Sequence, residues 1–166
     1  FAKAGVRDSE YLIVGDGPAK DRLERFAHDK WVGQHVRFLG RMPRDEALSI
    51  IGSASVLLHP SLHDSGGFVV AEAMAARVPV VCLDCGGPAV LVDDASGFRA
   101  PVDSVAGAVE YMAEAIRSLA ADPELARTMG EAGRAKVLKE HTWDAQVARF
   151  ERLYEDAIER WGEPAA

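Results

Sequence analysis

Two carboxylates flank a short glycine-bearing loop in the segment HDSGGFVVAEAMA, residues 63–75. Asp64 precedes the loop 65–67, and Glu72 follows Asp64 by eight positions. The residues after the loop are small and apolar, which favours a helix that packs on a core. The backbone N–H groups at the start of such a helix, together with the helix dipole, can bind a phosphate without a basic side chain. The segment therefore predicts an anion site close in sequence to two carboxylates.

The position of Glu72 on this helix excludes it from the core. At 100° per residue, Glu72 lies roughly 130° from the centre of the apolar face. That face is formed by Val69, Val70, Ala73 and Met74. Position alone favours a solvated carboxylate near a helix N-terminus, and Asp64 alone is as compatible with a turn or N-cap residue as with a ligand contact.

Two further glycine loops are expected at the carboxyl ends of strands, where open parallel sheets bind ligands. They are Gly15-Asp16-Gly17 and Gly86-Gly87. Each loop could present N–H groups to a phosphate, or its glycines could simply permit a tight turn with positive φ. The GDGP sequence lacks the G-x-G-x-x-G spacing of dinucleotide sites and the lysine of a P-loop. The loop 65–67 is the stronger candidate because of its acidic flanks.

The elements that must position these loops alternate along the chain. Continuous apolar runs are typical of parallel strands that are buried on both faces. Such strands are expected at 11–14, 35–40, 55–61, 78–83 and, with a weaker pattern, 96–102. Helical spacing and start signals such as Pro18 and Pro43 predict helices between them. The alternation predicts a Rossmann-like, three-layer α/β domain with a parallel sheet of about five strands.

The chain after Asp103 is expected to be helical to its end. Apolar spacing predicts helices over 105–119 and 122–137, and Asp122 and Thr142 are the expected caps of the second and third helices. The third helix carries an apolar stripe of Trp143, Val147, Phe150, Tyr154, Ile158 and Trp161. Residues 1–10, in contrast, are typical of a helix end followed by a loop. We therefore expect at least one strand-helix unit before Phe1.

Composition limits the classes of function. The 166 residues are 48% hydrophobic and 27% charged, which suits one domain, and a net charge of −7 argues against nonspecific binding to nucleic acid or anionic membranes. No run approaches the roughly 20 apolar residues of a membrane span, and the N-terminus does not resemble a signal peptide. We therefore expect a soluble, cytoplasmic protein.

The cysteines and histidines do not predict a metal site. Cys82 and Cys85 form a lone C-x-x-C, which we interpret as a buried strand residue and a loop residue in a reducing compartment. The five histidines are scattered. His63, beside Asp64, could approach a ligand, but a solvated loop position is the simpler interpretation.

The segment DSGGFVVAE followed by AMAARVPVV resembles the signature of the family 4 (group 1) retaining glycosyltransferases of the GT-B fold. Five other segments resemble family blocks in the same order. They are YLIVGDGP, VRFLGRMPRDE, ASVLLHPS, CGGPAVLVDDASGF and HTWDAQVARFERLYEDA. The similarity covers nearly the whole chain. It implies that residues 1–166 form a single domain, most of the C-terminal, nucleotide-sugar-binding half of such an enzyme.

The resemblance implies a role for each candidate residue. Glu72 would accept hydrogen bonds from two ribose hydroxyls of the donor nucleotide, and Asp64, the catalytic candidate, would contact the transferred sugar near its anomeric carbon. Backbone groups around Arg41 and Met42 would meet the base. The N–H groups that would hold the diphosphate and the sugar hydroxyls lie in the loop that begins at Ser65, and they belong to Gly66, Gly67, Phe68 and Val69.

Four positions depart from the family pattern. Asp64 stands where the family usually has a glutamate, and Gly66 stands where it has an aromatic residue. Arg77 replaces a usual glycine, and Val90 replaces a frequent acid. None of these differences changes Glu72 or the eight-residue spacing.

The activity implied by the resemblance is transfer of a sugar from a nucleoside-diphosphate sugar to an acceptor hydroxyl, with retention, in glycan biosynthesis and without a metal or cofactor. The family's diphosphate-binding arginine and lysine, and its domain for a saccharide or lipid-linked acceptor, would lie before Phe1. The terminal helix would cross back to that domain, and packing of its apolar stripe on the sheet of this domain remains the alternative. We therefore expect residues 1–166 alone to be inactive, and the full-length protein could associate peripherally with a membrane. A GT-B nucleotide-sugar epimerase and a noncatalytic nucleotide-binding or regulatory relative remain as alternatives.

Overall fold

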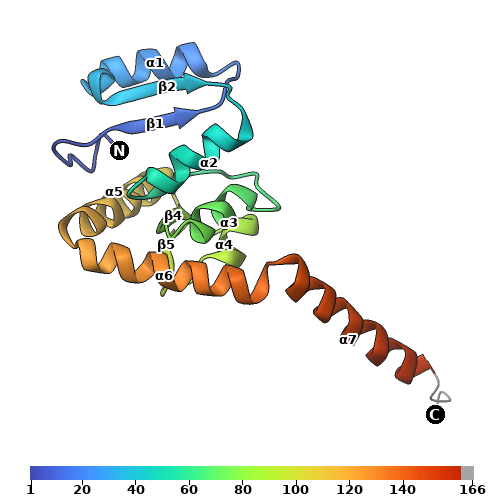
Figure 1. Cartoon of the computed structure of the whole chain (residues 1–166). Helices are drawn as coiled ribbons and strands as arrows, with labels where there is room; N and C mark the ends of the chain where they lie inside the picture. The colour runs from blue at the N-terminus through green and yellow to red at the C-terminus, as the bar shows by residue number, and fades with distance from the viewer. Residues whose placement is uncertain (162–166) are drawn as a thin grey trace.

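The computed structural model describes residues 1–161 and contains the predicted alternation of strands and helices (Figure 1). The strands are β1 (Tyr11–Val14), β2 (Val36–Gly40), β3 (Leu57–His59), β4 (Val80–Leu83) and β5 (Gly97–Ala100). The helices are α1 (Lys20–Asp29), α2 (Arg44–Ser53), α3 (Phe68–Ala75), α4 (Gly86–Leu91), α5 (Val105–Ala121), α6 (Pro123–Glu140) and α7 (Trp143–Trp161), with a 3-10 turn at Gly33–His35. Each predicted strand is confirmed, and α4 forms where the sequence indicates only a glycine loop.

The strands form two parallel sheets in place of the single sheet that was expected. β1 pairs with β2, with Tyr11 opposite Val36. β4 lies between β3 and β5, with Val80 opposite both Leu57 and Gly97. Within residues 1–161 no ladder joins β1 to β3, and both strands line a large cavity. The α/β class and the parallel pairing are confirmed, but the sheet is divided into a two-stranded part and a three-stranded part.

β4 shows how the three-stranded part is layered. All four of its side chains are buried, and alternate residues of a strand point to opposite faces. Val80 and Cys82 pack with residues of α3 and α4, whereas Val81 and Leu83 pack with residues of α5 and α6. Complete burial of one such aliphatic side chain contributes on the order of 1.5–3 kcal/mol. Helices therefore cover both faces of the strands, which confirms the three-layer arrangement.

The two cysteines lie as the sequence predicts. Cys82 is a fully buried residue of β4, and burial raises the pKa of its thiol to about 11. Cys85 is half-buried and directly precedes α4, and both thiols are free. Their positions agree with a structural interpretation of the C-x-x-C.

The long helices begin at side-chain caps. Asp122 accepts hydrogen bonds from the N–H groups of Glu124 and Leu125 at 3.0 Å, and Pro123 follows it at the first position of α6. Thr142 accepts a hydrogen bond from the N–H of Ala145 at 3.3 Å. Both predicted caps are confirmed, and each fixes where one helix ends and the next begins.

The turn between α3 and β4 lies directly against α6. Arg77 in this turn has φ of +64°, a conformation that costs an L-residue roughly 1–2 kcal/mol. A Cβ atom on Gly130 of α6 would lie 2.1 Å from the carbonyl oxygen of Arg77. Only a glycine at position 130 allows this approach. The glycine that Arg77 replaces in the family pattern would suit the backbone at position 77 better.

The terminal helix α7 extends away from the rest of the molecule (Figure 1). No residue of α7 is buried, and the side chains of Trp143 and Trp161 are 87% and 92% exposed. The apolar stripe therefore does not pack on the sheet of this domain. The crossing of this helix to another domain stays a prediction.

Candidate functional site

The loop between β3 and α3 carries most of the predicted site residues. Gly67 is the N-cap of α3 and has φ of +61°. A Cβ atom at this position would also lie 2.7 Å from Cδ1 of Leu91. Both the backbone conformation and the available space therefore require glycine at the start of α3.

Asp64 organises this loop with both of its carboxylate oxygens. Oδ1 accepts hydrogen bonds from the N–H groups of Gly67 at 2.7 Å and Gly66 at 3.1 Å. Oδ2 lies 2.9 Å from Nε2 of His59 at the end of β3. The N–H of Gly67, followed by the contacts with His59 and Gly66, holds the pKa of Asp64 below its usual range although partial desolvation opposes the shift. The carboxylate is therefore ionised at neutral pH and holds the loop in a fixed form.

This arrangement changes what the loop can offer to a ligand. The N–H groups of Gly66 and Gly67, predicted to bind the donor, donate to Asp64 in this structure. The N–H groups of Phe68 and Val69 belong to the first turn of α3, where no preceding helical carbonyl is available to them. A ligand at this helix start would therefore meet Phe68 and Val69 first.

The space beside Gly66 is taken by the ring of Phe68. A Cβ atom on Gly66 would lie 3.0 Å from Cε2 of that ring, which is itself 80% exposed. The aromatic residue that the family has at position 66 would collide with Phe68 in this arrangement. This chain thus places its aromatic ring two residues later in the sequence but close to the same place.

The Gly86-Gly87 loop packs directly against the Asp64 loop. The N–H of Gly87 donates to the carbonyl oxygen of Asp64 at 2.8 Å. Cβ atoms on Gly86 and Gly87 would lie 2.5 and 2.6 Å from the carbonyl oxygens of Asp64 and Ser65. Two of the three predicted glycine loops therefore form one unit. The third loop, Gly15-Asp16-Gly17, lies at the end of β1 in the two-stranded part.

Glu72 projects from α3 toward the start of α2. Its Oε1 lies 2.6 Å from Nη2 of Arg44, and the Glu72 side chain is 22% exposed. The prediction that Glu72 lies outside the core is confirmed, but the carboxylate is held by a cation instead of being freely solvated. Arg44 is the first residue of α2. Because Arg41 and Met42 come just before α2, this ion pair ties the segment predicted to meet the base to the helix that carries Glu72.

Arg44 and His59 are contacts that sequence reasoning missed. A cation in the first turn of a helix opposes the helix dipole, so Arg44 after Pro43 is a signal that a partner carboxylate is near. His59 carries a weaker signal, since a polar residue ends an otherwise apolar strand. His63, for which the sequence favours a solvated loop position, is an exposed residue of this loop.

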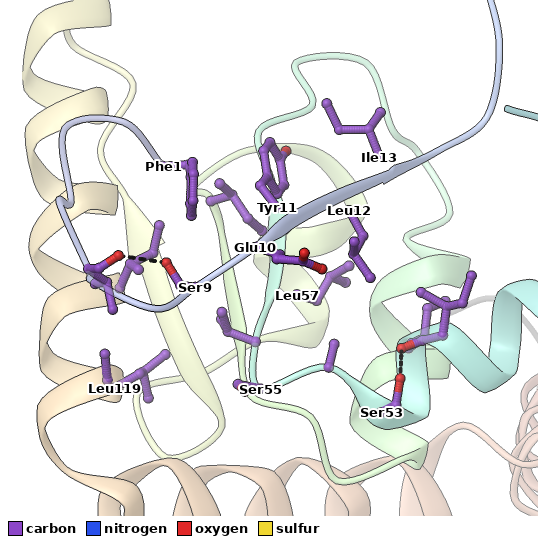
Figure 2. Close-up of a pocket in the computed structure, with 18 of the residues that line it drawn as sticks. Phe1, Ser9, Glu10, Tyr11, Leu12, Ile13, Ser53, Ser55, Leu57 and Leu119 are labelled. Carbon is purple, nitrogen blue, oxygen red and sulfur yellow. Dashed lines mark hydrogen bonds between the residues drawn. The ribbon is translucent and has the colours of Figure 1, made fainter. Parts of the chain in front are cut away.

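The site opens onto the cavity between the two parts of the sheet. The cavity has a volume of 1070 Å³, and His59, Val69 and Glu72 are among the residues that line it. Figure 2 shows Tyr11, Leu12 and Ile13 on β1 and Leu57 on β3 around this space. Glu72 and Val69, of the predicted site residues, therefore border the space between β1 and β3.

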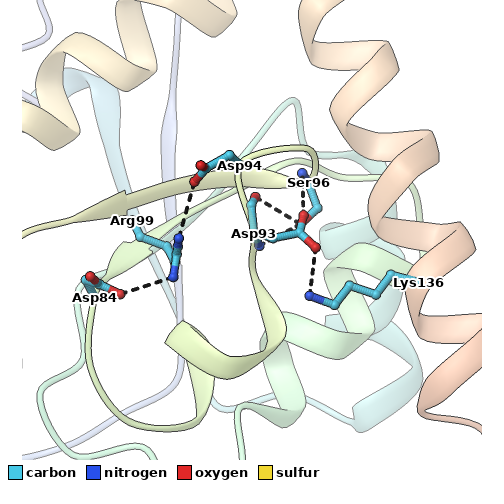
Figure 3. A network of polar contacts seen from close by, with 6 residues as sticks. All are labelled: Asp84, Asp93, Asp94, Ser96, Arg99 and Lys136. Atoms are coloured by element: carbon cyan, nitrogen blue, oxygen red, sulfur yellow. Dashed lines mark hydrogen bonds and ion pairs between the residues drawn. The ribbon is translucent and has the colours of Figure 1, made fainter.

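A separate polar network supports the turn between α4 and β5 (Figure 3). Lys136 of α6 contacts Asp93 at 2.8 Å, and this contact, with that of Ser96, holds the pKa of Asp93 below its usual range. Arg99 of β5 contacts Asp84 at 3.4 Å and Asp94 at 3.3 Å. These contacts fix the helix α4 that carries the second glycine loop. Val90 of α4, at the position of the family's acid, is 75% exposed.

Residues 1–161 contain neither a cluster of metal ligands nor a membrane-spanning helix. No three histidine, cysteine, aspartate or glutamate side chains lie together as a metal-binding group in this part of the chain. In the same range, no helix has the length and apolar character needed to span a membrane.

Comparison with known proteins decides the family. Residues 3–136 match the family described as glycosyl transferases group 1. The chain belongs to this family. The resemblance found in the sequence is confirmed, and the group 1 assignment covers the strands, the glycine loops and both carboxylates discussed above.

Curated relatives of this group 1 chain include two mannosyltransferases. The chain is 35% identical over 156 residues to the GDP-mannose-dependent alpha-(1-6)-phosphatidylinositol monomannoside mannosyltransferase of Mycolicibacterium smegmatis. It is 32% identical over 153 residues to the corresponding monoacylated-substrate mannosyltransferase of Corynebacterium glutamicum. The matches cover 89% and 88% of this chain but only 40% and 39% of the relatives.

Solved structures confirm the GT-B fold class. Sucrose-phosphate synthase from Thermosynechococcus elongatus superposes with a TM-score of 0.80 at 28% identity, covering 96% of this chain and 41% of that one. HepE from Anabaena, in complex with UDP, superposes with a TM-score of 0.74 at 22% identity, covering 95% and 43%. The group 1 chain thus spans about two fifths of the length of the proteins it matches.

Proposed function

We propose that this chain is the donor-binding domain of a retaining glycosyltransferase, which transfers a sugar from a nucleoside-diphosphate sugar to an acceptor hydroxyl. The observation that carries the proposal is the position of the Glu72 carboxylate. Glu72 lies just over one turn into α3, forms an ion pair with Arg44 of α2, and belongs to the segment that matches the group 1 family. The relatives named for GDP-mannose and the structure that contains UDP support a nucleotide-sugar donor. They do not favour the epimerase or the noncatalytic alternative.

Glu72 would bind the ribose of the donor. An ionised carboxylate accepts hydrogen bonds on about four lone-pair positions, so Oε1 can retain Arg44 while both oxygens accept ribose hydroxyls. The guanidinium fixes the carboxylate before the nucleotide arrives. The segment around Arg41 and Met42, tied to Glu72 through Arg44, is then placed to meet the base.

The start of α3 would bind the diphosphate. The N–H groups of Phe68 and Val69, with the positive end of the helix dipole, favour negative charge at this place. As the sugar departs, charge develops on the diphosphate, and fixed N–H groups stabilise it without rearrangement. We propose that this stabilisation, with cations supplied outside residues 1–166, makes a metal unnecessary.

Asp64 would contribute in two ways. Its contacts with Gly66, Gly67 and His59 fix the loop. Its remaining lone pairs can accept hydrogen bonds from hydroxyls of the transferred sugar. The acceptor, a saccharide or a lipid-linked sugar, would be bound by polypeptide outside residues 1–166, and transfer would take place in the cytoplasm.

Titration calorimetry on the full-length protein tests this proposal. UDP, GDP and ADP are titrated into the wild type, Glu72→Ala and, as a matched surface control, Glu114→Ala on α5. We expect Glu72→Ala to weaken the best nucleotide by roughly 10- to 100-fold, the effect of losing a charge-assisted contact worth about 1.5–3 kcal/mol, and Glu114→Ala to have no effect.

The ribose assignment has its own check in the same experiment. The wild type should bind the 2′-deoxy form of the best nucleotide more weakly than the parent nucleotide. Glu72→Ala should bind the two forms with equal affinity. Equal binding of a nucleotide by the wild type and Glu72→Ala would show that the ribose lies elsewhere.

A further inference from the structure

Phe68 leaves an aromatic ring exposed beside the Asp64 loop. It is the first residue of α3 and is 80% exposed. The other apolar residues of α3 belong to, or pack against, the core cluster around Val80 and Cys82 of β4, and Phe68 does neither. The ring therefore takes no part in holding α3 on the sheet.

Two other exposed apolar residues come from the segments that form this loop unit. Leu62, two positions before Asp64, is 67% exposed, and Val90 of α4 is 75% exposed. Val90 lies about one helical turn after Gly87, whose N–H donates to the carbonyl oxygen of Asp64. Single exposed apolar residues are normal on a protein surface, but apolar residues gathered in one region mark a contact with a ligand or a partner. The Asp64 loop is therefore a candidate for such a contact.

The Phe68 ring and the Asp64 carboxylate meet at Gly66. A Cβ atom on Gly66 would lie 3.0 and 3.1 Å from Cε2 and Cδ2 of Phe68, so the ring covers the space that a side chain at position 66 would fill. The N–H of Gly66 donates to Oδ1 of Asp64 at 3.1 Å. The contacts of Asp64 with Gly67 and His59 still leave acceptor capacity on a carboxylate that has about four lone-pair positions. An apolar ring and a hydrogen-bond acceptor thus border the same stretch of backbone.

A pyranose ring matches this pair of surfaces. Its hydroxyl groups lie around its edge and donate hydrogen bonds, whereas several of its C–H groups point to one face and form an apolar patch. The face of an aromatic ring carries partial negative charge and attracts such C–H groups. An acyl chain or an apolar peptide would cover the Phe68 ring, but it would also remove water from the ionised Asp64 without giving it a hydrogen bond, which is costly. A sugar satisfies both groups.

We propose that the Phe68 ring packs on the C–H face of the transferred sugar and determines how tightly the sugar part of the donor binds. The inference rests on the proposed function, in which the diphosphate lies at the start of α3. The N–H of Phe68 meets that diphosphate, and its side chain reaches Gly66, which is bonded to Asp64. Two residues of α3 then divide recognition of the donor. Glu72 binds the ribose, Phe68 binds the sugar, and the donor is a nucleoside-diphosphate pyranose.

Paired titrations on the full-length protein test this division. UDP and UDP-glucose, GDP and GDP-mannose, and ADP and ADP-glucose are titrated into the wild type by calorimetry, and the pair that binds best is then titrated into the variants. Phe68→Ala removes the ring, and Phe68→Tyr retains it. Val105→Ala is the matched control, because Val105 is also the first residue of a helix and is 84% exposed.

The expected losses differ between the two ligands of the pair. Phe68→Ala should weaken the nucleotide sugar by about 3- to 10-fold, the effect of losing one aromatic contact, and should change the affinity for the nucleoside diphosphate by less than about twofold. Phe68→Tyr and Val105→Ala should bind both ligands as the wild type does. Proton NMR gives a second readout, because sugar C–H resonances over an aromatic ring shift upfield. This shift should be present in the wild-type complex and absent from the Phe68→Ala complex.

Several results would overturn the inference. If Phe68→Ala weakens the nucleoside diphosphate as much as the nucleotide sugar, the ring only supports the loop. If neither affinity changes, or if the sugar resonances do not shift, the ring lies away from the donor. If the wild type binds none of these ligands, the inference and the proposed function both fail. If binding depends on Glu72 but Phe68→Ala does not discriminate between the two ligands, only the inference fails.

Discussion

β1 and β4 have similar sequences and different environments. YLIV and VVCL are both four-residue apolar runs, yet every side chain of β4 is buried, whereas no residue of β1 is fully buried and Val14 is 39% exposed. Within residues 1–161, β4 has a strand on each side and helices on both faces, whereas β1 has a paired strand on one side only. An apolar run thus indicates that the side chains of a strand should be buried. Whether they are buried depends on the strands and helices that pack around it.

Truncation of matched side chains in the two parts should have the largest effect. Met74 of α3 is 0% exposed and packs with Val80 and Cys82 of β4, so Met74→Ala should lower the free energy of unfolding by about 2–5 kcal/mol. Leu12→Ala in half-buried β1 should cost less than half as much when residues 1–166 are studied alone. Urea denaturation followed by circular dichroism measures both. Equal losses would show that β1 is as well packed as β4.

Loss of the Arg44 guanidinium should have an intermediate effect. Arg44 joins α2, which connects the two parts of the sheet, to Glu72 of α3. Arg44→Ala should weaken nucleotide binding by about 3- to 10-fold, because the carboxylate is no longer fixed but Arg44 is itself 72% exposed. Arg44→Lys should recover part of the affinity, and calorimetry at two salt concentrations measures both variants. If Arg44→Ala binds the nucleotide as tightly as the wild type while Glu72→Ala binds it more weakly, Glu72 does not need Arg44 to bind the nucleotide.

Replacement of Arg77 should have the smallest effect and the opposite sign. Even the well-packed part of the domain contains a strained residue, since Arg77 has φ of +64°. Arg77→Gly should raise the free energy of unfolding by about 0.5–1 kcal/mol, because relief of the left-handed conformation exceeds the added freedom of glycine in the unfolded chain. Its exposed ion pair with Glu131 contributes little.

Arg77→Ala is the matched control for that variant. Alanine removes the same ion pair but keeps the left-handed strain, so it should be no more stable than the wild type. If chemical denaturation gives the same free energy of unfolding for Arg77→Ala and Arg77→Gly, backbone strain at position 77 is not the cause of the stabilisation.

Local signals in the sequence predicted the elements and missed the contacts between them. Pro43, Asp122 and Thr142 marked helix starts because caps and proline act within one turn. The apolar runs marked the strands for the same reason. The position of Glu72 outside the core also followed from the helical period alone.

The missed features join residues that are far apart in sequence. Arg44 meets Glu72 across 28 positions, and Gly87 meets Asp64 across 23. The division of the sheet is of the same kind, since pairing between strands depends on which edges meet and not on the period within a strand. The sequence predicts that Asp64 and the N–H groups of Gly66 and Gly67 lie together, but it assigns all three to a ligand. A carboxylate that accepts hydrogen bonds from its own loop has the same residue pattern as one that faces a ligand, so the sequence does not distinguish the two.

The closed loop at Asp64 has a thermodynamic consequence. Ordering a flexible loop around a ligand costs about 1–2 kcal/mol per residue in backbone entropy. Residues 65–67 are already held by Asp64, His59 and the packed Gly86-Gly87 turn. If a nucleotide sugar binds at α3 as proposed, it meets a loop that is already ordered, and its binding should show a small entropic penalty and an association rate set by encounter instead of by loop closure.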